Sequence, residues 1–192
     1  MQERSEGMGA ELATTVEATV TPVDAADHVD GPTGAHATLV VYGDYECPFT
    51  RGTHQTIRHL LSRGEVDFRY VFRHFPLAAL HPHATNAARA AEAAASIGRF
   101  WQMHDTLFAH QDALDDAALL RHAVANGVGA AGVRAALEQG VHDRRIARDL
   151  ESGLAAGVRG TPTLFVSGRR YVGPRRSREL GAALRDTMPS VD

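Results

Sequence analysis

The single cysteine of the chain, Cys47, is the side chain with the clearest capacity for covalent chemistry. Because one cysteine cannot form an internal disulfide, it is free, paired with another molecule, or inert. Pro48 follows directly and suits the first turn of a helix, where its missing N–H would have no partner in any case. Unpaired backbone N–H groups at a helix start favour the thiolate, which is the nucleophilic form of the side chain. The pattern therefore predicts a reactive sulfur at the beginning of a helix.

The neighbours of Cys47 act on that thiolate in different ways. Glu46 disfavours the thiolate by charge repulsion, and Arg51, one turn later, offsets this effect. The hydroxyl of Thr50 is expected to donate a hydrogen bond to the sulfur from within one helical turn. Phe49 is expected either to contact an incoming partner through its apolar ring or to pack on a neighbouring loop.

Hydrophobic patterning predicts the elements that position Cys47. Four segments have the β-branched, aromatic or alternating pattern of strands: residues 38–42, 66–72, 163–166 and 170–172. A helix follows the first strand, an Ala-rich helical block covers about residues 81–157, and a last helix lies near residues 175–186. Strands separated by helices need crossovers, so the first two strands are expected to be parallel, whereas the Ser167-Gly168 turn makes the last two antiparallel.

These elements predict an α/β fold in a single domain over residues 37–188. The domain is expected to contain a mixed four-stranded sheet with flanking helices and an all-helical block inserted between the second and third strands. A polar, partly mobile N-terminal extension is expected over residues 1–36, although residues 23–29 could lie against the domain. Residues 189–192 are expected to form a short tail.

The composition is that of an ordinary globular protein, with 44% hydrophobic and 22% charged residues and a net charge of -3. This balance favours neither nucleic acid nor a membrane surface as a partner, and it carries no signal for the oligomeric state. The first 22 residues lack an apolar run, so no secretory signal peptide is expected, and no segment approaches the roughly 18 apolar residues of a membrane helix. A cytoplasmic location is the resulting expectation.

The 11 histidines match no familiar spacing of metal ligands, even where His81 and His83 lie close together in sequence. No metal site and no tightly bound cofactor are therefore expected. His104 is expected to be structural, and Phe100 and Trp101 are expected to lie in the core of the helical block.

Several segments resemble the DsbA-like thiol oxidoreductases of the thioredoxin superfamily, over about residues 27–184. They are Tyr42-Gly-Asp-Tyr-Glu-Cys-Pro-Phe-Thr50, Phe72-Arg-His-Phe-Pro-Leu77 with His81-Pro82, Gly98-Arg-Phe-Trp-Gln-Met-His-Asp105 with Leu107-Phe108, and Gly157-Val-Arg-Gly-Thr-Pro-Thr163. The resemblance implies a thioredoxin-like fold, a redox-active thiol at Cys47, and a cis-proline at Pro162 that faces it. It also implies that the backbone of Thr161 pairs with an extended substrate segment.

The chain departs from this family at Thr50, where the resemblance implies a second cysteine. A dithiol resolves its own mixed disulfide, whereas Cys47 needs an external thiol for that step, so a low-molecular-weight thiol is the expected co-substrate. The resemblance thus implies a monothiol thiol–disulfide oxidoreductase that acts on small thiols or disulfide-bearing proteins and peptides, with Pro48, Phe49, Thr161 and Pro162 binding the substrate. Two alternatives stay open on the same fold: a redox-silent peptide- or protein-binding module, and a thiol-dependent transferase, isomerase or peroxidase.

Overall fold

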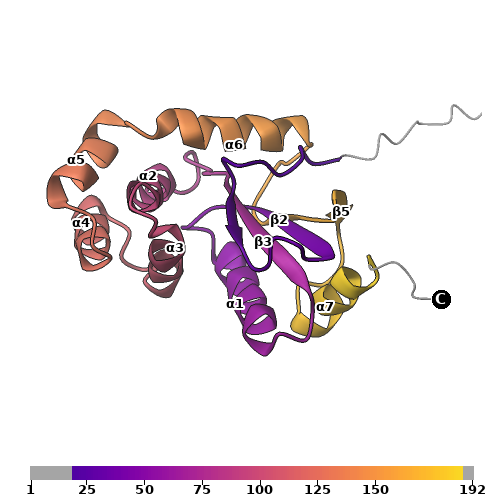
Figure 1. The fold of residues 1–192 in the computed structure, drawn as a ribbon. Helices are drawn as coiled ribbons and strands as arrows, with labels where there is room; N and C mark the ends of the chain where they lie inside the picture. Colours follow the sequence, from indigo (N-terminus) through magenta and orange to yellow (C-terminus); the bar gives the residue numbers. More distant parts are fainter. Residues whose placement is uncertain (1–18, 188–192) are drawn as a thin grey trace, which may run out of the picture.

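The computed structural model describes residues 19–187, which form an α/β fold with five strands in one sheet and seven helices around it (Figure 1). The strands are β1 (His28–Asp30), β2 (Ala37–Gly43), β3 (Phe68–His74), β4 (Thr163–Val166) and β5 (Arg169–Tyr171). The helices are α1 (Pro48–Arg63), α2 (Ala84–Ala95), α3 (Phe100–Ala109), α4 (Asp116–Ala125), α5 (Ala130–Gln139), α6 (Asp143–Ala155) and α7 (Ser177–Arg185).

The sheet has the order β1-β3-β2-β4-β5, which places β2 at its centre. β2 pairs parallel with β3 and antiparallel with β4, so that Leu39 lies opposite both Tyr70 and Val166. β4 pairs antiparallel with β5 through a tight turn in which Ser167 and Gly168 both have positive φ, the backbone that suits the twist of a two-residue hairpin. The predicted parallel first pair and antiparallel last pair are confirmed.

The prediction of four strands is wrong by one, because β1 adds an edge strand. β1 pairs antiparallel with β3, with Val29 opposite Val71. It falls within residues 1–36, so the folded domain begins earlier than residue 37. The strand has three residues with one apolar side chain, and its pairing with β3 specifies it rather than any alternation of its own. Residues 1–18 and the predicted tail at 189–192 lie outside the described residues.

A buried ion pair attaches the segment before β1 to the sheet. Arg73 donates from Nε and Nη2 to the two carboxylate oxygens of Asp27, each at 2.8 Å. The same guanidinium donates to the carbonyl oxygens of Thr21 and Pro22 and to the hydroxyl of Tyr42, at 3.0–3.1 Å. Burial opposes ionisation of Asp27, but the hydrogen bonds from Arg73, a backbone hydrogen bond and the positive charge of Arg73 together outweigh it, so the pKa of Asp27 lies below its usual value.

Two hydrophobic cores lie on opposite faces of the sheet, as the alternation of β2 dictates. Leu39 and Val41 belong to the larger core, and Val40 and Tyr42 to the smaller one. Helices α1 and α7 cover one face, whereas α6 runs across the other (Figure 1). The loop between β2 and α1 therefore lies at an edge of the sheet, between the helices that cover its two faces.

The helical block predicted for residues 81–157 consists of five helices, α2 to α6, and is confirmed as an insertion between β3 and β4. Helices α2 to α5 gather beside the sheet (Figure 1). Gly140 ends α5 with a φ of 61°, where a Cβ would lie 2.4 Å from the carboxylate of Asp143. Within residues 19–187, none of the helices has the length and apolarity needed to cross a membrane.

Candidate active site at Cys47

Cys47 occupies the N-cap position of α1, directly after the turn that follows β2. Its backbone is extended, with φ -77° and ψ 118°, and Pro48 fills the first helical position. Gly43 ends β2 beneath the site, where a Cβ would lie 2.4 Å from the ring of Phe72 and 2.8 Å from Thr50 Cγ2. Strand, turn and helix thus place the thiol at the carboxyl edge of the sheet, as predicted.

The turn before Cys47 is held by the buried carboxylate of Asp44. Its Oδ1 accepts a hydrogen bond from the backbone N–H of Glu46 at 2.8 Å. Its Oδ2 accepts from the backbone N–H of Leu77 at 2.8 Å and contacts His81 Nδ1 at 2.8 Å. The role of Asp44 was not predicted from the sequence, although an acidic residue at a turn commonly accepts hydrogen bonds from the turn's own N–H groups.

The helical insertion also holds the turn from the other side. Gln111, in the loop between α3 and α4, donates from Nε2 to the carbonyl oxygens of Tyr45 at 2.7 Å and Cys47 at 3.0 Å. The carboxylate of Glu46 accepts from the backbone N–H of His83 at 2.7 Å, just before α2. The charge of Glu46 is therefore engaged at the insertion. Gln111 was not identified from the sequence, because only the fold brings it to the turn.

The sulfur points toward the loop before β4. Cys47 Sγ donates a hydrogen bond to the carbonyl oxygen of Thr161 at 3.3 Å. The Thr161–Pro162 peptide bond is cis, and both residues are half-buried. The structure therefore brings Cys47, Thr161 and Pro162 together across 114 residues of sequence. Cys47 retains only 4% of its surface, so the residue is buried.

The expected hydrogen bond from Thr50 to the sulfur is wrong. Cys47 makes no side-chain capping hydrogen bond, and the N–H groups of Thr50 and Arg51 donate instead to the carbonyl oxygen of Cys47 at 3.1 and 3.2 Å. The hydroxyl of Thr50 does not bond to the sulfur and has no partner among the described residues, although Thr50 is 1% exposed. The sulfur instead makes its hydrogen bond to Thr161, across from the helix.

The turn presents an apolar surface next to the buried sulfur. Phe49 is 67% exposed, and Pro48 beside it is also exposed. Packing of Phe49 on a neighbouring loop, one of the two expectations for this ring, is therefore wrong. An exposed phenylalanine at this position is available to an incoming molecule.

The chain matches the model of a thioredoxin family, described as Thioredoxin, over residues 24–186. It belongs to the thioredoxin family. The predicted thioredoxin-like fold is also confirmed, since the similar solved structures include BdbD from Bacillus subtilis, with a TM-score of 0.78 and 18% identity, covering 88% of this chain and 96% of that one. A thioredoxin-like oxidoreductase from Silicibacter pomeroyi has a TM-score of 0.75 and 25% identity, covering 85% and 92%. The thiol-disulfide exchange protein alpha-DsbA2 from Wolbachia pipientis has a TM-score of 0.74 and 20% identity, covering 85% and 88%.

Curated relatives of this thioredoxin-family chain carry the name of a membrane transporter. A Na(+)/H(+) antiporter, NhaA 3 of Salinispora tropica, is 45% identical over 174 residues, which are 88% of this chain and 26% of that protein. NhaA 1 of Salinispora arenicola is 44% identical over 164 residues, covering 85% and 25%. The chain thus spans about a quarter of the length of these relatives.

Behind the active-site turn of this thioredoxin fold lies His104, which is fully buried among aromatic rings. Its Nδ1 bonds to the hydroxyl of Tyr45 at 2.9 Å, and its Nε2 lies 3.4 Å from the hydroxyl of Tyr70. Burial holds the pKa of His104 well below 6.5 and raises the pKa of both tyrosines well above 10.0. The predicted structural role of His104 agrees with this position, and Trp101 packs against the same core.

A second polar cluster joins His28, His74 and Glu92, and it was missed from the sequence because these residues lie far apart in the chain. Both imidazoles contact the same carboxylate oxygen of Glu92, at 2.6 and 2.8 Å. Burial opposes ionisation of Glu92, but the two histidine hydrogen bonds outweigh it and hold its pKa far below the usual range. These residue types could hold a metal ion, which contrasts with the expectation that no metal site is present.

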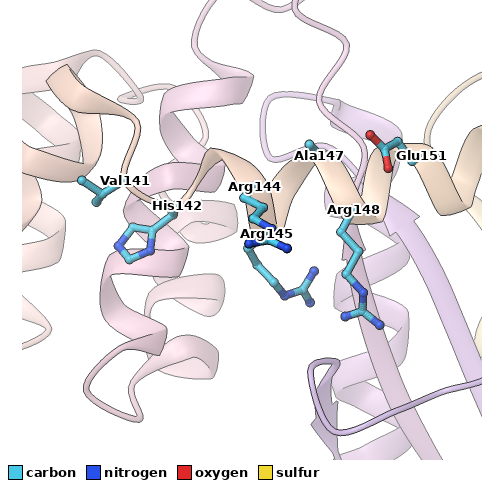
Figure 2. A pocket seen from close by; sticks show the side chains of 7 residues that line it. All are labelled: Val141, His142, Arg144, Arg145, Ala147, Arg148 and Glu151. Carbon is cyan, nitrogen blue, oxygen red and sulfur yellow. The ribbon is translucent and has the colours of Figure 1, made fainter.

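A surface hollow of about 660 Å³ lies along the first turns of α6. Figure 2 shows Arg145 and Arg148 extending toward the same side of the helix, with Glu151 pointing away from them. Arg145 pairs with Asp149, and Arg148 pairs with Asp24. Neither Cys47 nor the predicted substrate-binding residues line this hollow, so it is separate from the thiol site.

Proposed function

We propose that the chain is a monothiol thiol–disulfide oxidoreductase that reacts through Cys47. The observation that carries the proposal is the 3.3 Å contact between Cys47 Sγ and the carbonyl oxygen of Thr161, beside the cis peptide bond to Pro162. It places the one thiol of the chain next to the backbone of a half-buried loop. The family also supports this chemistry, because its similar members include proteins named as oxidoreductases and as thiol-disulfide exchange proteins.

The proposed reaction has two exchange steps. In the first, the Cys47 thiolate attacks one sulfur of a disulfide, a Cys47–S–S–R bond forms, the original S–S bond breaks, and the other half leaves as a thiolate that takes up a proton. In the second, an external thiolate attacks the R sulfur, which releases Cys47 and forms a new external disulfide. Oxidation and reduction balance between the substrates, so the protein itself returns to its starting state.

Substrate binding in this proposal uses the surface around the sulfur. The exposed ring of Phe49 contacts an apolar side chain, and the backbone of Thr161 pairs with an extended segment of the substrate. Because Cys47 is 4% exposed, the sulfur must leave its hydrogen bond to Thr161 before it attacks. We therefore expect reaction with a small disulfide, or with the disulfide of a flexible peptide, to be faster than with a disulfide inside a rigid protein.

The direct test is incubation of the full chain with oxidised glutathione, followed by intact mass measurement. We expect one glutathione adduct per chain, no adduct in Cys47→Ser, and persistence of the adduct until a second thiol is added. Thr50→Cys supplies an internal resolving thiol and should release the adduct at least about 100-fold faster. A wild-type chain that forms no adduct, or a Thr50→Cys chain that releases it no faster, would refute the proposed geometry.

A redox-silent binding module is the second candidate, and the 4% exposure of Cys47 beside the 67% exposed Phe49 favours it. The adduct experiment distinguishes the oxidoreductase from the binding module, because a binding module shows no reaction at Cys47. The transport activity named for the curated relatives is not part of either proposal, because the chain spans about a quarter of their length. The cytoplasmic location and the small-thiol co-substrate stay predictions.

A further inference from the structure

We propose that His28, His74 and Glu92 form a binding site for one Zn²⁺ ion. The three side chains come from three different elements: β1, the last residue of β3, and α2. His28 Nε2 and His74 Nε2 lie 2.6 and 2.8 Å from the same oxygen of Glu92, and the three ligand atoms all lie within 4.8 Å of one another. Two imidazole nitrogens and one carboxylate oxygen form a donor set that zinc binds with an open fourth position.

The pairing register of β1 and β3 brings two of the ligands, His28 and His74, to neighbouring positions. β1 pairs with β3 so that His28 lies opposite Phe72, two residues before His74. The ring of His28 stacks on Phe100, with centroids 3.5 Å apart and planes 8° apart. The side chains of His74 and Glu92 are 1% and 6% exposed, whereas His28 is 15% exposed. Two ligands are therefore fixed inside the protein, and the third lies at the entrance from solvent.

Binding of the ion requires a small outward movement of the ligands. Two ligands of a tetrahedral zinc with bonds of 2.0–2.1 Å lie about 3.3 Å apart, so the observed 2.6 and 2.8 Å contacts must widen by roughly half an ångström or slightly more. His28 can supply much of this movement, because β1 is the edge strand and pairs only on one side among the described residues. Each imidazole must also present a lone pair at Nε2, so its proton moves to Nδ1 or is released.

The lack of a hydrogen-bond acceptor for one histidine limits the affinity of the site for zinc. Nδ1 of His74 is buried and has no hydrogen-bond partner among the described residues. Zinc-bound histidines usually donate a hydrogen bond from the second ring nitrogen, and His74 lacks an acceptor for it. We therefore infer a site of moderate affinity, in which the ion joins β1 to β3 and α2 and stabilises the edge of the sheet.

The test uses the full chain carrying Cys47→Ser, so that the thiol cannot act as a zinc ligand. Zinc is titrated in competition with a chromophoric chelator, and we expect one ion per chain. His28→Gln should weaken zinc binding at least about tenfold, because it removes one of the three ligands of the ion. The matched control His110→Gln removes an exposed histidine that contacts a neighbouring histidine ring, His122, and should leave the affinity unchanged.

Thermal unfolding gives an independent readout. At free zinc 100-fold above the dissociation constant, we expect the melting temperature of the Cys47→Ser chain to rise by about 5–10 °C over its value with a chelator, and that of His28→Gln to rise by no more than about half as much. Should His28→Gln fail to fold, Co²⁺ absorption of the Cys47→Ser chain decides, because a bound tetrahedral ion gives intense visible bands. No stoichiometric binding, an affinity equal in His28→Gln, or an absence of these bands would overturn the proposal.

Discussion

Acid destabilisation through His104 is the prediction that the structure defines best. His104 is fully buried, and burial holds its pKa well below 6.5 in the folded chain. Below pH 6.5 the unfolded chain therefore binds a proton that the folded chain does not, so stability falls as the pH falls through this range. Each such proton changes the free energy of unfolding by about 1.4 kcal/mol per pH unit, which amounts to about 2 kcal/mol between pH 7 and pH 5.

The variant His104→Phe removes this proton site and keeps a ring of similar size among the surrounding aromatic residues. At pH 7 we expect it to be less stable by about 1–3 kcal/mol, because the buried hydroxyl of Tyr45 loses its partner. At pH 5 protonation of His104 stabilises the unfolded parent chain and so lowers the parent's free energy of unfolding. The variant has no such group. The gap between the two chains should therefore narrow by about 2 kcal/mol from pH 7 to pH 5.

Urea unfolding at several pH values measures this gap, with far-UV circular dichroism and the fluorescence of the single tryptophan, Trp101, as the two probes. The matched control is His59→Gln, which replaces an exposed histidine on α1 and isolates the effect of burial. A gap between His104→Phe and the parent that stays constant from pH 7 to pH 5 would contradict the assignment of His104 as a buried neutral imidazole.

Three further variants test other parts of the structure. Asp27→Asn leaves the buried charge of Arg73 without its partner and should lower the free energy of unfolding by about 3–5 kcal/mol, measured by urea unfolding. Gln111→Leu removes two hydrogen bonds to the active-site turn and should change the rate of alkylation of Cys47 while costing about 1–2 kcal/mol of stability; an unchanged rate would mean that the turn keeps its shape alone. Phe49→Ala should alter stability by less than about 0.5 kcal/mol and weaken adduct formation with apolar peptide disulfides, compared with glutathione as the control.

The sheet and the helical insertion could be predicted because long segments with a regular hydrophobic pattern indicate their secondary structure. The run before Gly43 reads as a buried strand, and the pairing directions follow from the connections between strands. β1 could not be predicted in this way, since three residues with one apolar side chain carry no periodicity. Its existence depends on the edge of β3 and on the pairing of Asp27 with Arg73, which are tertiary features.

The candidate site was predictable in its residues and less so in its geometry. Cys47 and the Thr161–Pro162 loop were identified together through the family resemblance, since no local pattern joins residues 114 positions apart. The direction of the sulfur and the unpartnered hydroxyl of Thr50 depend on side-chain rotamers within the folded site, which the chain order does not specify. Gln111 was missed for the same reason, because a loop glutamine has no signature until its contacts are known.

The hydrogen bonds from Gln111 have a consequence for any attempt to transplant this chemistry. The backbone around Cys47 takes its shape partly from a loop more than sixty residues further along the chain, inside the insertion. A chimera that carries only the strand, turn and first helix onto a smaller scaffold would lose the hydrogen bonds from Gln111 and the contact with the carbonyl of Thr161. Grafts of this reactive centre would have to move three separate segments together, and the insertion would be one of the donors.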